Sequence, residues 1–230
     1  IGSASLVLES LADDDFHRPT LEGIISAGER AAQLTQQLLA YAGKGRFYLE
    51  RVDLSEEVVK ASRLIHVSIP NNVRLRLDLD SHLPLLLADP GQLQQVVTNL
   101  IINAVEATGN GGGIVQVRTG RQSVIGERLP DLIPGQKVVP GEFVFLEVLD
   151  NGPGMDEETK RKIFDPFFTT KFTGRGLGLA AVLGIVRQHR GIVQVHSVPG
   201  LGTSFRILFC VDETVPALPR EDVSREDLQG

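Results

Sequence analysis

Apolar residues recur at roughly helical spacing in two stretches near the start of the chain, residues 1–12 and 20–42. A polar loop that ends in Pro19 separates the stretches, and Gly43 follows the second one. The pattern predicts a helical hairpin with one long apolar stripe. Because such a stripe needs a partner surface, we expect two chains to form a four-helix bundle, which would make the protein a homodimer.

Beyond residue 46 the apolar spacing alternates between the periods of strands and helices. The helix that begins at Pro90 is clearly marked, because Asp89 can cap it and proline suits a first helical turn. A polar insertion with proline and glycine, about 121–141, predicts a surface loop, and the acidic sequence from Asp212 onwards predicts a linker or tail. The predicted strands are 47–54, 73–79, 85–88, 114–119, 143–149, 192–197 and 204–210, and the predicted helices are 55–69, 90–107, 156–164 and about 176–190.

Composition and charge exclude several classes of protein. The chain has 230 residues, 42% hydrophobic and 23% charged, which is ordinary for a soluble globular protein with a real core. Its net charge of −6 argues against a general binder of nucleic acid or membrane surfaces, and no apolar stretch approaches the ~20 residues of a membrane helix. The single cysteine, Cys210, excludes an intrachain disulfide and fits a cytosolic protein. It ends an apolar strand, so we expect it to be buried.

The helix after Pro90 carries two asparagines, Asn99 and Asn103, whose spacing of four places both amides on one face. An amide oxygen is a neutral, hard ligand that suits a Mg²⁺ ion already bound to phosphates. Taken alone, such a pair more often consists of surface or capping asparagines. The apolar residues around the pair predict a largely buried helix, however, and buried amides need partners.

The sequence Asp150-Asn-Gly-Pro-Gly-Met directly follows the predicted strand 143–149. A carboxylate at a strand end can accept a hydrogen bond from an exocyclic amine such as that of adenine. Glycines there allow the backbone to approach a flat ligand closely. By itself, an Asp-Asn-Gly sequence more often forms a plain turn.

Glycines also lead into a predicted helix N-terminus, in the segment 169–179. Free backbone N–H groups and the helix dipole favour phosphate at such a place, and Lys171 adds a positive charge. The spacing of Gly176, Gly178 and Ala181 fits a loose dinucleotide-binding fingerprint. That fingerprint follows a strand directly, whereas a polar loop precedes this segment, so we reject it.

A fourth segment, Gly200-Leu-Gly-Thr-Ser-Phe, joins two predicted strands and by itself predicts a hairpin loop. In this order the four segments resemble the nucleotide-binding motifs of sensor histidine kinases. These kinases belong to the ATPase superfamily that also contains type II topoisomerase subunits, one class of heat-shock chaperones and mismatch-repair ATPases. The resemblance covers about 47–211. Residues 1–42 also resemble the end of the kinases' dimerisation hairpin, and 39–45 is similar to the linker of the hybrid type.

The resemblance implies an α+β fold of the Bergerat type, a mixed α/β sandwich in which helices cover one face of a mixed sheet, preceded by a helical hairpin. It divides the chain into a partial dimerisation hairpin (1–45), an ATP-binding catalytic domain (46–211) and a linker or tail (212–230). It implies ATP and Mg²⁺ as cofactors. The residues that match the family's site are Asn99 and Asn103 on the metal side, Asp150 at adenine with Gly152 and Gly154 around it, Phe164 and Phe168 at the base of a mobile lid over about 165–175, Lys171, Gly176 and Gly178 at the phosphates, and Thr203 beside adenine.

The chain departs from the family pattern at two places. Glu106 stands where many of these kinases carry Lys or Arg, and a carboxylate there would repel phosphate, so no role is assigned to it. The family's phosphoacceptor histidine precedes an Asp or Glu on the first helix of the hairpin. None of the five histidines fits, since His17, for example, precedes Arg18. We therefore expect the acceptor upstream of Ile1, in a longer protein.

The implied function is transfer of the γ-phosphoryl group of ATP to a histidine of the dimerisation helix, for relay to a response regulator or receiver domain. A hydrolase of the same superfamily is one alternative. Those enzymes use a Glu as general base one helical turn before the metal asparagine, where this chain has Asn99, which cannot take up a proton at neutral pH. Transfer to histidine needs mainly positioning and charge neutralisation. A non-catalytic ATP-sensing or dimerisation module is a second alternative. We expect a cytoplasmic location, with no nucleic-acid partner and no membrane contact by this part of the protein.

Overall fold

The computed structural model describes residues 2–12, 15–28, 48–126, 129–171 and 176–211. At the start of the chain, α1 (Gly2–Ser10) is followed by a turn and by a second helical stretch, residues 18–28. This agrees with the predicted pair of helices as far as residue 28. The rest of the predicted second helix, the predicted boundary between residues 45 and 46, and the predicted tail from residue 212 lie outside the described residues.

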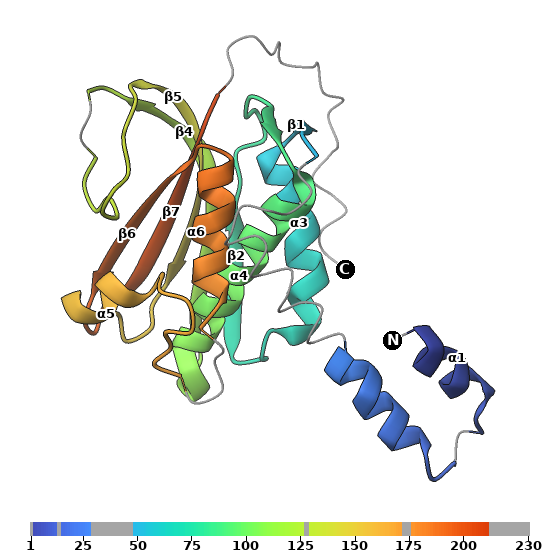
Figure 1. The fold of residues 1–230 in the computed structure, drawn as a ribbon. Helices are drawn as coiled ribbons and strands as arrows, with labels where there is room; N and C mark the ends of the chain where they lie inside the picture. The colour runs from blue at the N-terminus through green and yellow to red at the C-terminus, as the bar shows by residue number, and fades with distance from the viewer. Residues whose placement is uncertain (1, 13–14, 29–47, 127–128, 172–175, 212–230) are drawn as a thin grey trace.

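A five-stranded sheet with the order β2-β4-β5-β7-β6 forms the centre of the domain (Figure 1). Strands β2 and β4 are parallel and the other neighbours are antiparallel, so the sheet is mixed, as expected. The strands are β2 (Val73–Asp78), β4 (Gly113–Val124), β5 (Gly141–Asp150), β6 (Ile192–Val198) and β7 (Gly202–Cys210). A separate antiparallel ribbon pairs β1 (Glu50–Val52) with β3 (Leu86–Ala88).

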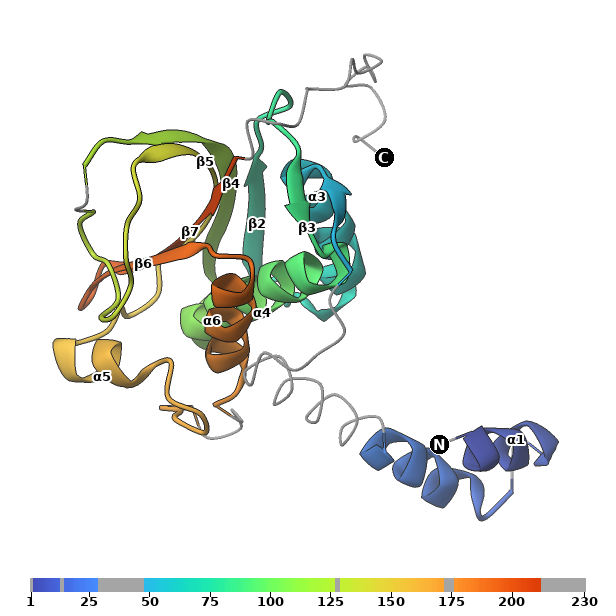
Figure 2. The same cartoon turned by 45° about the horizontal axis from the view of Figure 1, so that its top comes forward.

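Three helices pack on one face of the sheet, as Figure 2 shows: α3 (Leu54–Ile65), α4 (Pro90–Thr108) and α6 (Gly178–Gln188). The central helix α4 contacts both other helices and also β4 and β5. The connections include a short helix after β5, α5 (Glu157–Lys162), and two 3-10 turns, η1 (His66–Ser68) and η2 (Gly109–Gly111). The predicted α+β fold, with helices on one face of a mixed sheet, is confirmed.

The core lies between this helical layer and the sheet. Helix α4 buries residues at positions three or four apart, which explains why an apolar stripe in the sequence becomes one buried face. Each fully buried aliphatic side chain contributes about 1.5–3 kcal/mol to folding. The buried residues of α4 are Leu93, Val96, Val97, Leu100, Ile101, Ala104 and Val105, and β7 meets them with Phe205, Ile207 and Phe209.

The register of β5 against β7 decides where the polar strand ends lie. Asp150, the last residue of β5, is paired with Thr203 at the start of β7, and Ser197 of β6 is paired with the same threonine. Three polar residues that are far apart in the sequence therefore become neighbours at one end of the sheet.

Some predicted boundaries are wrong. The predicted strand 47–54 shrinks to β1, because the Asp53 carboxylate accepts hydrogen bonds from the backbone N–H groups of Ser55 and Glu56 and so begins α3 at Leu54. Strands β4 and β5 are longer than predicted and extend into the insertion at 121–141.

The insertion is only partly a surface loop. Ile133 and Val138 are buried, and Ile133 donates a backbone hydrogen bond of 3.4 Å to the carbonyl of Val193 in β6. Val138 joins a second apolar cluster with Phe143 and Leu208. The insertion therefore packs against the sheet, because its few apolar residues find partners there that its polar composition did not predict.

Cys210 is exposed, so the expectation of a buried cysteine is wrong. Side chains alternate along β7, and the buried Phe209 takes the position that faces the core. Within the described residues, no helix is both long enough and apolar enough to span a membrane.

Candidate functional site

A cavity of about 500 Å³ lies beside α4, between the end of β5 and the N-terminus of α6. Among the predicted site residues, only Gly152 and Phe164 do not line it. The predicted residues that do line the cavity are Asn99, Asn103, Asp150, Gly154, Phe168, Lys171, Gly176, Gly178 and Thr203.

Asp150 is a buried carboxylate at one end of the cavity, with 9% of the residue exposed. Its Oδ1 accepts a hydrogen bond of 2.9 Å from the backbone N–H of Gly152, which explains how Gly152 contributes without lining the cavity. Burial raises the pKa of Asp150. The N–H groups of Gly152 and Thr203 and the charge of Lys171 act in the opposite direction and only partly offset this rise. A partly desolvated acceptor of this kind suits a neutral donor such as an exocyclic amine.

Thr203 lies beside Asp150 and is also buried, with 8% of the residue exposed. Its hydroxyl is 2.9 Å from the hydroxyl of Ser197, which in turn accepts a hydrogen bond of 2.8 Å from the backbone N–H of Met155. This chain of contacts ties the loop after β5 to the ends of β6 and β7. The position of the carboxylate is therefore fixed by the sheet.

Two glycines allow the backbone to pass close to itself at this end. Gly154 has φ +66°, and a Cβ there would lie 2.1 Å from the carbonyl oxygen of Val198. Gly202 has φ +105°, and a Cβ there would lie 2.0 Å from the carbonyl oxygen of Asp150. No other residue fits either position without displacing the backbone. The sequence prediction included Gly154 but missed Gly202, although its motif Gly-Leu-Gly-Thr was recognised.

The two asparagines of α4 line the middle of the cavity and are half-buried. Asn99 donates a hydrogen bond of 3.3 Å from Nδ2 to the carbonyl of Gly178, and so joins α4 to the start of α6. Asn103 accepts a hydrogen bond of 2.9 Å at Oδ1 from the ammonium of Lys171. Both amides have hydrogen-bond partners among the residues of the cavity, as expected for amides on a largely buried helix.

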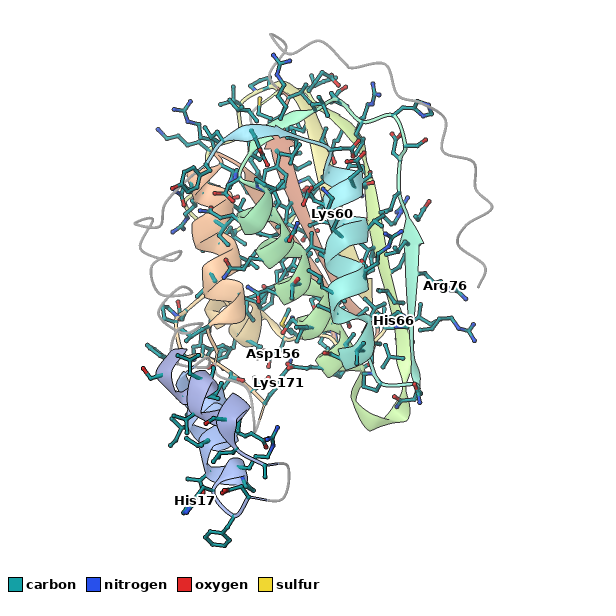
Figure 3. The ribbon with its side chains drawn as sticks, turned by 90° about the vertical axis from the view of Figure 1, so that its right-hand side faces the viewer. His17, Lys60, His66, Arg76, Asp156 and Lys171 are labelled. Carbon is teal, nitrogen blue, oxygen red and sulfur yellow. The ribbon has the colours of Figure 1, made fainter. Side chains whose placement is uncertain are left out.

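The other end of the cavity is formed by the N-terminus of α6 and by the segment before it. Leu177, the N-cap residue of α6, makes no side-chain hydrogen bond to the first helical turn, so its side chain leaves the N–H groups there without a cap. Helix α6 is eleven residues long, and its dipole adds positive potential at this end. Lys171 is the one lysine or arginine among the described residues that line the cavity. Figure 3 shows it below the helices, near the end of α4.

The aromatic segment before Lys171 is held partly by the core. Phe164 packs edge-on against Phe205 of β7, with ring centroids 6.5 Å apart, and so anchors the segment to the core. Phe168 lines the cavity itself. The backbone N–H of Phe167 donates a hydrogen bond of 2.8 Å to the carbonyl of Gly176, which closes the base of the predicted lid. Lid residues 172–175 lie outside the described residues.

Several cavity residues were not predicted. Glu106 lines the cavity, and its Oε2 is 2.8 Å from Nζ of Lys171, although no role was assigned to it from the sequence. Its position three residues after Asn103 on α4 is the signal that could have located it. The apolar wall was not part of the predicted site and consists of Ile102, Met155, Ile163, Leu177, Leu179 and Phe205. Most of these residues lie within the recognised segments, but no role was assigned to their side chains.

The amino-acid sequence over residues 88–213 matches the family described as "Histidine kinase-, DNA gyrase B-, and HSP90-like ATPase". A curated relative, the sensor kinase CckA of Brucella abortus, is 34% identical over 209 residues, which cover 90% of this chain and 22% of CckA. The chain spans between 22% and 58% of the length of the first three curated relatives that it matches.

Solved histidine kinases have the same fold. The catalytic domain of the histidine kinase ThkA is 28% identical, with a TM-score of 0.56, over 71% of this chain and 96% of that one. ThkA in complex with the response regulator protein TrrA aligns with a TM-score of 0.58 at 23% identity, over 92% of this chain and 56% of that one. Full-length ShkA in complex with AMPPNP aligns with a TM-score of 0.70 at 24% identity, over 94% of this chain and 43% of that one.

Proposed function

The chain belongs to the family of histidine kinase-, DNA gyrase B- and HSP90-like ATPases, and on this premise we propose that its cavity binds Mg·ATP for transfer of the γ-phosphoryl group to a histidine. The domain is the ATP-binding catalytic domain of a histidine kinase. One observation carries the proposal. One cavity joins a buried strand-end carboxylate, Asp150, to the N-terminus of α6 and the ammonium of Lys171.

The Asp150 end of the cavity would bind adenine. The carboxylate would accept a hydrogen bond from the exocyclic amine, and the Thr203 hydroxyl would help to hold the base. The apolar wall, which includes Met155 and Ile163, offers surfaces for the faces of the ring. Gly152 and Gly154 shape this end, because the first orients the carboxylate and the second lets the loop turn closely past β6.

The opposite end would bind the phosphates. Free N–H groups at the start of α6, beside Gly176 and Gly178, favour an anion, and Lys171 would neutralise charge. Asn99 and Asn103 would face the metal, and the amide oxygen of Asn103, which already accepts a hydrogen bond from a cation, is a hard donor that fits Mg²⁺. Mg²⁺, when bound, neutralises charge on the phosphate oxygens during transfer.

A kinase fits this cavity better than a hydrolase does. A hydrolase of this superfamily needs a base to activate water, and the position one turn before Asn103 is Asn99, whose amide cannot take up a proton. Two carboxylates are among the described residues that line the cavity, and both already have partners. Asp150 accepts a hydrogen bond from the N–H of Gly152, and Glu106 pairs with Lys171. Transfer to an imidazole requires no such base.

The phosphoacceptor would lie on a dimerisation helix, as the resemblance implies. Among the chain's own histidines, His189 is unsuited. Its ring nitrogens contact the Ile185 carbonyl at 2.9 Å and the Asp89 N–H at 3.0 Å, and burial lowers its pKa. His17 lies at the turn between the two N-terminal helices, and His66 in η1 lies on the other side of the domain's helical layer from α6 (Figure 3).

Partners and location follow from the same proposal. The apolar side chains Leu6, Val7 and Ile24 are exposed on the two N-terminal helices, which supports a homodimer that covers them. The relay would continue to a response regulator or receiver domain. Because ATP is the substrate and the single cysteine excludes an intrachain disulfide, we place the reaction in the cytoplasm.

Calorimetry and a hydrolysis assay test the proposal together. We expect ATP to bind this chain in Mg²⁺ with little steady release of phosphate, and we expect the full-length protein to retain radiolabel from ATP on a histidine under conditions that preserve acid-labile phosphohistidine. Sustained hydrolysis would favour the hydrolase. Binding without label in the full-length protein would favour a non-catalytic ATP-sensing module. Failure to bind ATP would overturn all three functions.

A further inference from the structure

Glu106 lies in the cavity even though a carboxylate close to ATP phosphates should be unfavourable. It lines the cavity with Asn103, Lys171 and Gly178, and about half of its side chain is exposed. Two negative groups facing each other across a partly desolvated cavity repel unless a cation lies between them. The presence of Glu106 in the cavity therefore requires a positive partner whenever phosphates are bound.

The structure shows what such a partner contacts. The ammonium of Lys171 lies 2.8 Å from Oε2 of Glu106, 2.9 Å from Oδ1 of Asn103 and 3.3 Å from the backbone carbonyl oxygen of Asn103. These are a carboxylate, an amide and a carbonyl oxygen that converge on one positive charge. Hard oxygen atoms of these three types are the protein ligands that Mg²⁺ takes, with waters and phosphate oxygens completing its shell.

Helix α4 presents these oxygen atoms as a preformed set. Asn103 and Glu106 are three residues apart, which places both side chains on the same face of the helix. The other side of the helix is buried in the core through Val97, Ile101 and Ala104. The ligands therefore belong to a rigid element, whereas Lys171 belongs to the segment that leads into the predicted lid.

We propose that Glu106 and Asn103 are the protein ligands of the magnesium site and that this site is occupied alternately by the Lys171 ammonium and by Mg²⁺. Without nucleotide the lysine ammonium fills the site. When Mg·ATP binds, Glu106 and Asn103 would hold the ion, and Lys171 would leave these oxygen atoms and pair with phosphate oxygens. This inference rests on the proposed binding of ATP. It makes Glu106 a ligand of the metal ion, although its carboxylate by itself would repel phosphate.

The magnesium dependence of ATP binding tests the role of Glu106. We would titrate ATP calorimetrically into the wild type and Glu106→Gln, in excess Mg²⁺ and in EDTA. The wild type should bind ATP more tightly with Mg²⁺. Glu106→Gln should lose most of that gain, about 10- to 100-fold, because one ligand of the ion is weakened. Its affinity in EDTA should be unchanged or higher, because a negative charge near the phosphates is gone.

A matched control is available on α5. Glu158 pairs with Lys162 at 2.8 Å, the same distance as in the Glu106–Lys171 pair, but does not line the cavity. Glu158→Gln should keep the full magnesium gain. If Glu106→Gln also keeps it while the wild type binds ATP, the inference is wrong and the proposed function stands. If the wild type does not bind ATP at all, the proposed function fails as well.

The exchange between lysine and ion has its own test. We would titrate Mn²⁺, a spectroscopic substitute for Mg²⁺, into the nucleotide-free protein and follow the free ion by electron paramagnetic resonance. Lys171→Met should bind Mn²⁺ more tightly than the wild type by on the order of tenfold, because the competing ammonium is absent. The double variant Lys171→Met with Glu106→Gln should lose this gain. Equal Mn²⁺ affinity of Lys171→Met and the wild type would refute the exchange.

Discussion

The two ends of the cavity are held by different kinds of contact. At the Asp150 end, strand register, backbone hydrogen bonds and two close backbone approaches fix the geometry, and the polar residues are at least nine-tenths buried. At the Lys171 end, partly exposed side chains hold one another through a single ammonium group. In our proposal the rigid end would bind the base, and the adjustable end would exchange one cation for another.

Gly202→Ala should have the largest effect on stability, because it forces the backbone to move at the Asp150 end of the cavity. The new Cβ would lie 2.0 Å from the carbonyl oxygen of Asp150 at φ +105°, so the free energy of unfolding should fall by about 3 kcal/mol or more. Urea denaturation measures it. Gly200→Ala is the control, since Gly200 also has positive φ but faces open space and should lose only about 1–2 kcal/mol. If the two variants lost equal free energy of unfolding, the close approach of residue 202 to the Asp150 carbonyl would not explain the loss.

Asp150→Asn should weaken ATP binding without unfolding the domain. A hydrogen bond to a charged group contributes about 1.5–3 kcal/mol, so the dissociation constant should rise about 10- to 100-fold by calorimetry. Because burial raises the pKa of Asp150, its ionised form is unfavourable in the folded protein, and the variant should be as stable as the wild type or more stable at neutral pH. Unchanged affinity would contradict the adenine assignment.

Acidification should weaken ATP binding through the same carboxylate. The pKa of Asp150 is raised in the free protein, and a hydrogen bond from adenine favours the ionised form, so binding should release a proton. Affinity should therefore fall as the pH decreases through this raised pKa, by up to about tenfold per pH unit. Calorimetry of the wild type and of Asp150→Asn from neutral to mildly acidic pH measures this effect. Protonation of ATP itself should weaken binding to both proteins, so the additional loss of affinity in the wild type belongs to Asp150.

Hydrogen exchange should distinguish the two ends directly. Backbone amides of 165–171 should become protected by about tenfold or more when Mg·ATP binds, because this segment leads into the predicted lid and has few buried contacts. Amides of β5 and β7, already locked in the sheet, should change much less. Mass spectrometry of peptides with and without nucleotide gives both values. Similar protection in both states across 165–171 would argue against a lid.

Removal of the ion pair at the adjustable end should have the smallest effect on stability. Glu106→Gln breaks a pair whose side chains are 49% and 30% exposed, so the free energy of unfolding without nucleotide should change by less than about 1 kcal/mol. Urea denaturation without nucleotide measures this change. A larger loss would mean that the Lys171 end is as rigid as the Asp150 end, and the comparison would no longer hold.

The sequence predicted most of the fold because its elements are marked by local signals. Asp89 caps α4 through the N–H of Gln92, as expected, and the alternation of apolar and polar residues identified β2 closely. The insertion and Cys210 were misjudged, because burial of a short polar segment or of a strand's last residue depends on what packs against it. Of the site, the motifs located Asp150, Asn99 and Asn103 within one cavity. Glu106 was left without a role because it departs from the family pattern, although its spacing from Asn103 was a signal for it.

The sequence by itself determined the order of the elements, the membership of the chain in its family and the residue types available for chemistry, because these depend on spacing along the chain. The tertiary structure alone decided which of those residues meet. The pairing of Asp150 with Thr203 follows from the register of β5 and β7, and the contact of Lys171 with Asn103 and Glu106 joins segments more than sixty residues apart. Contacts of this kind have no local signal, because they result from the packing of the whole helical layer on the sheet.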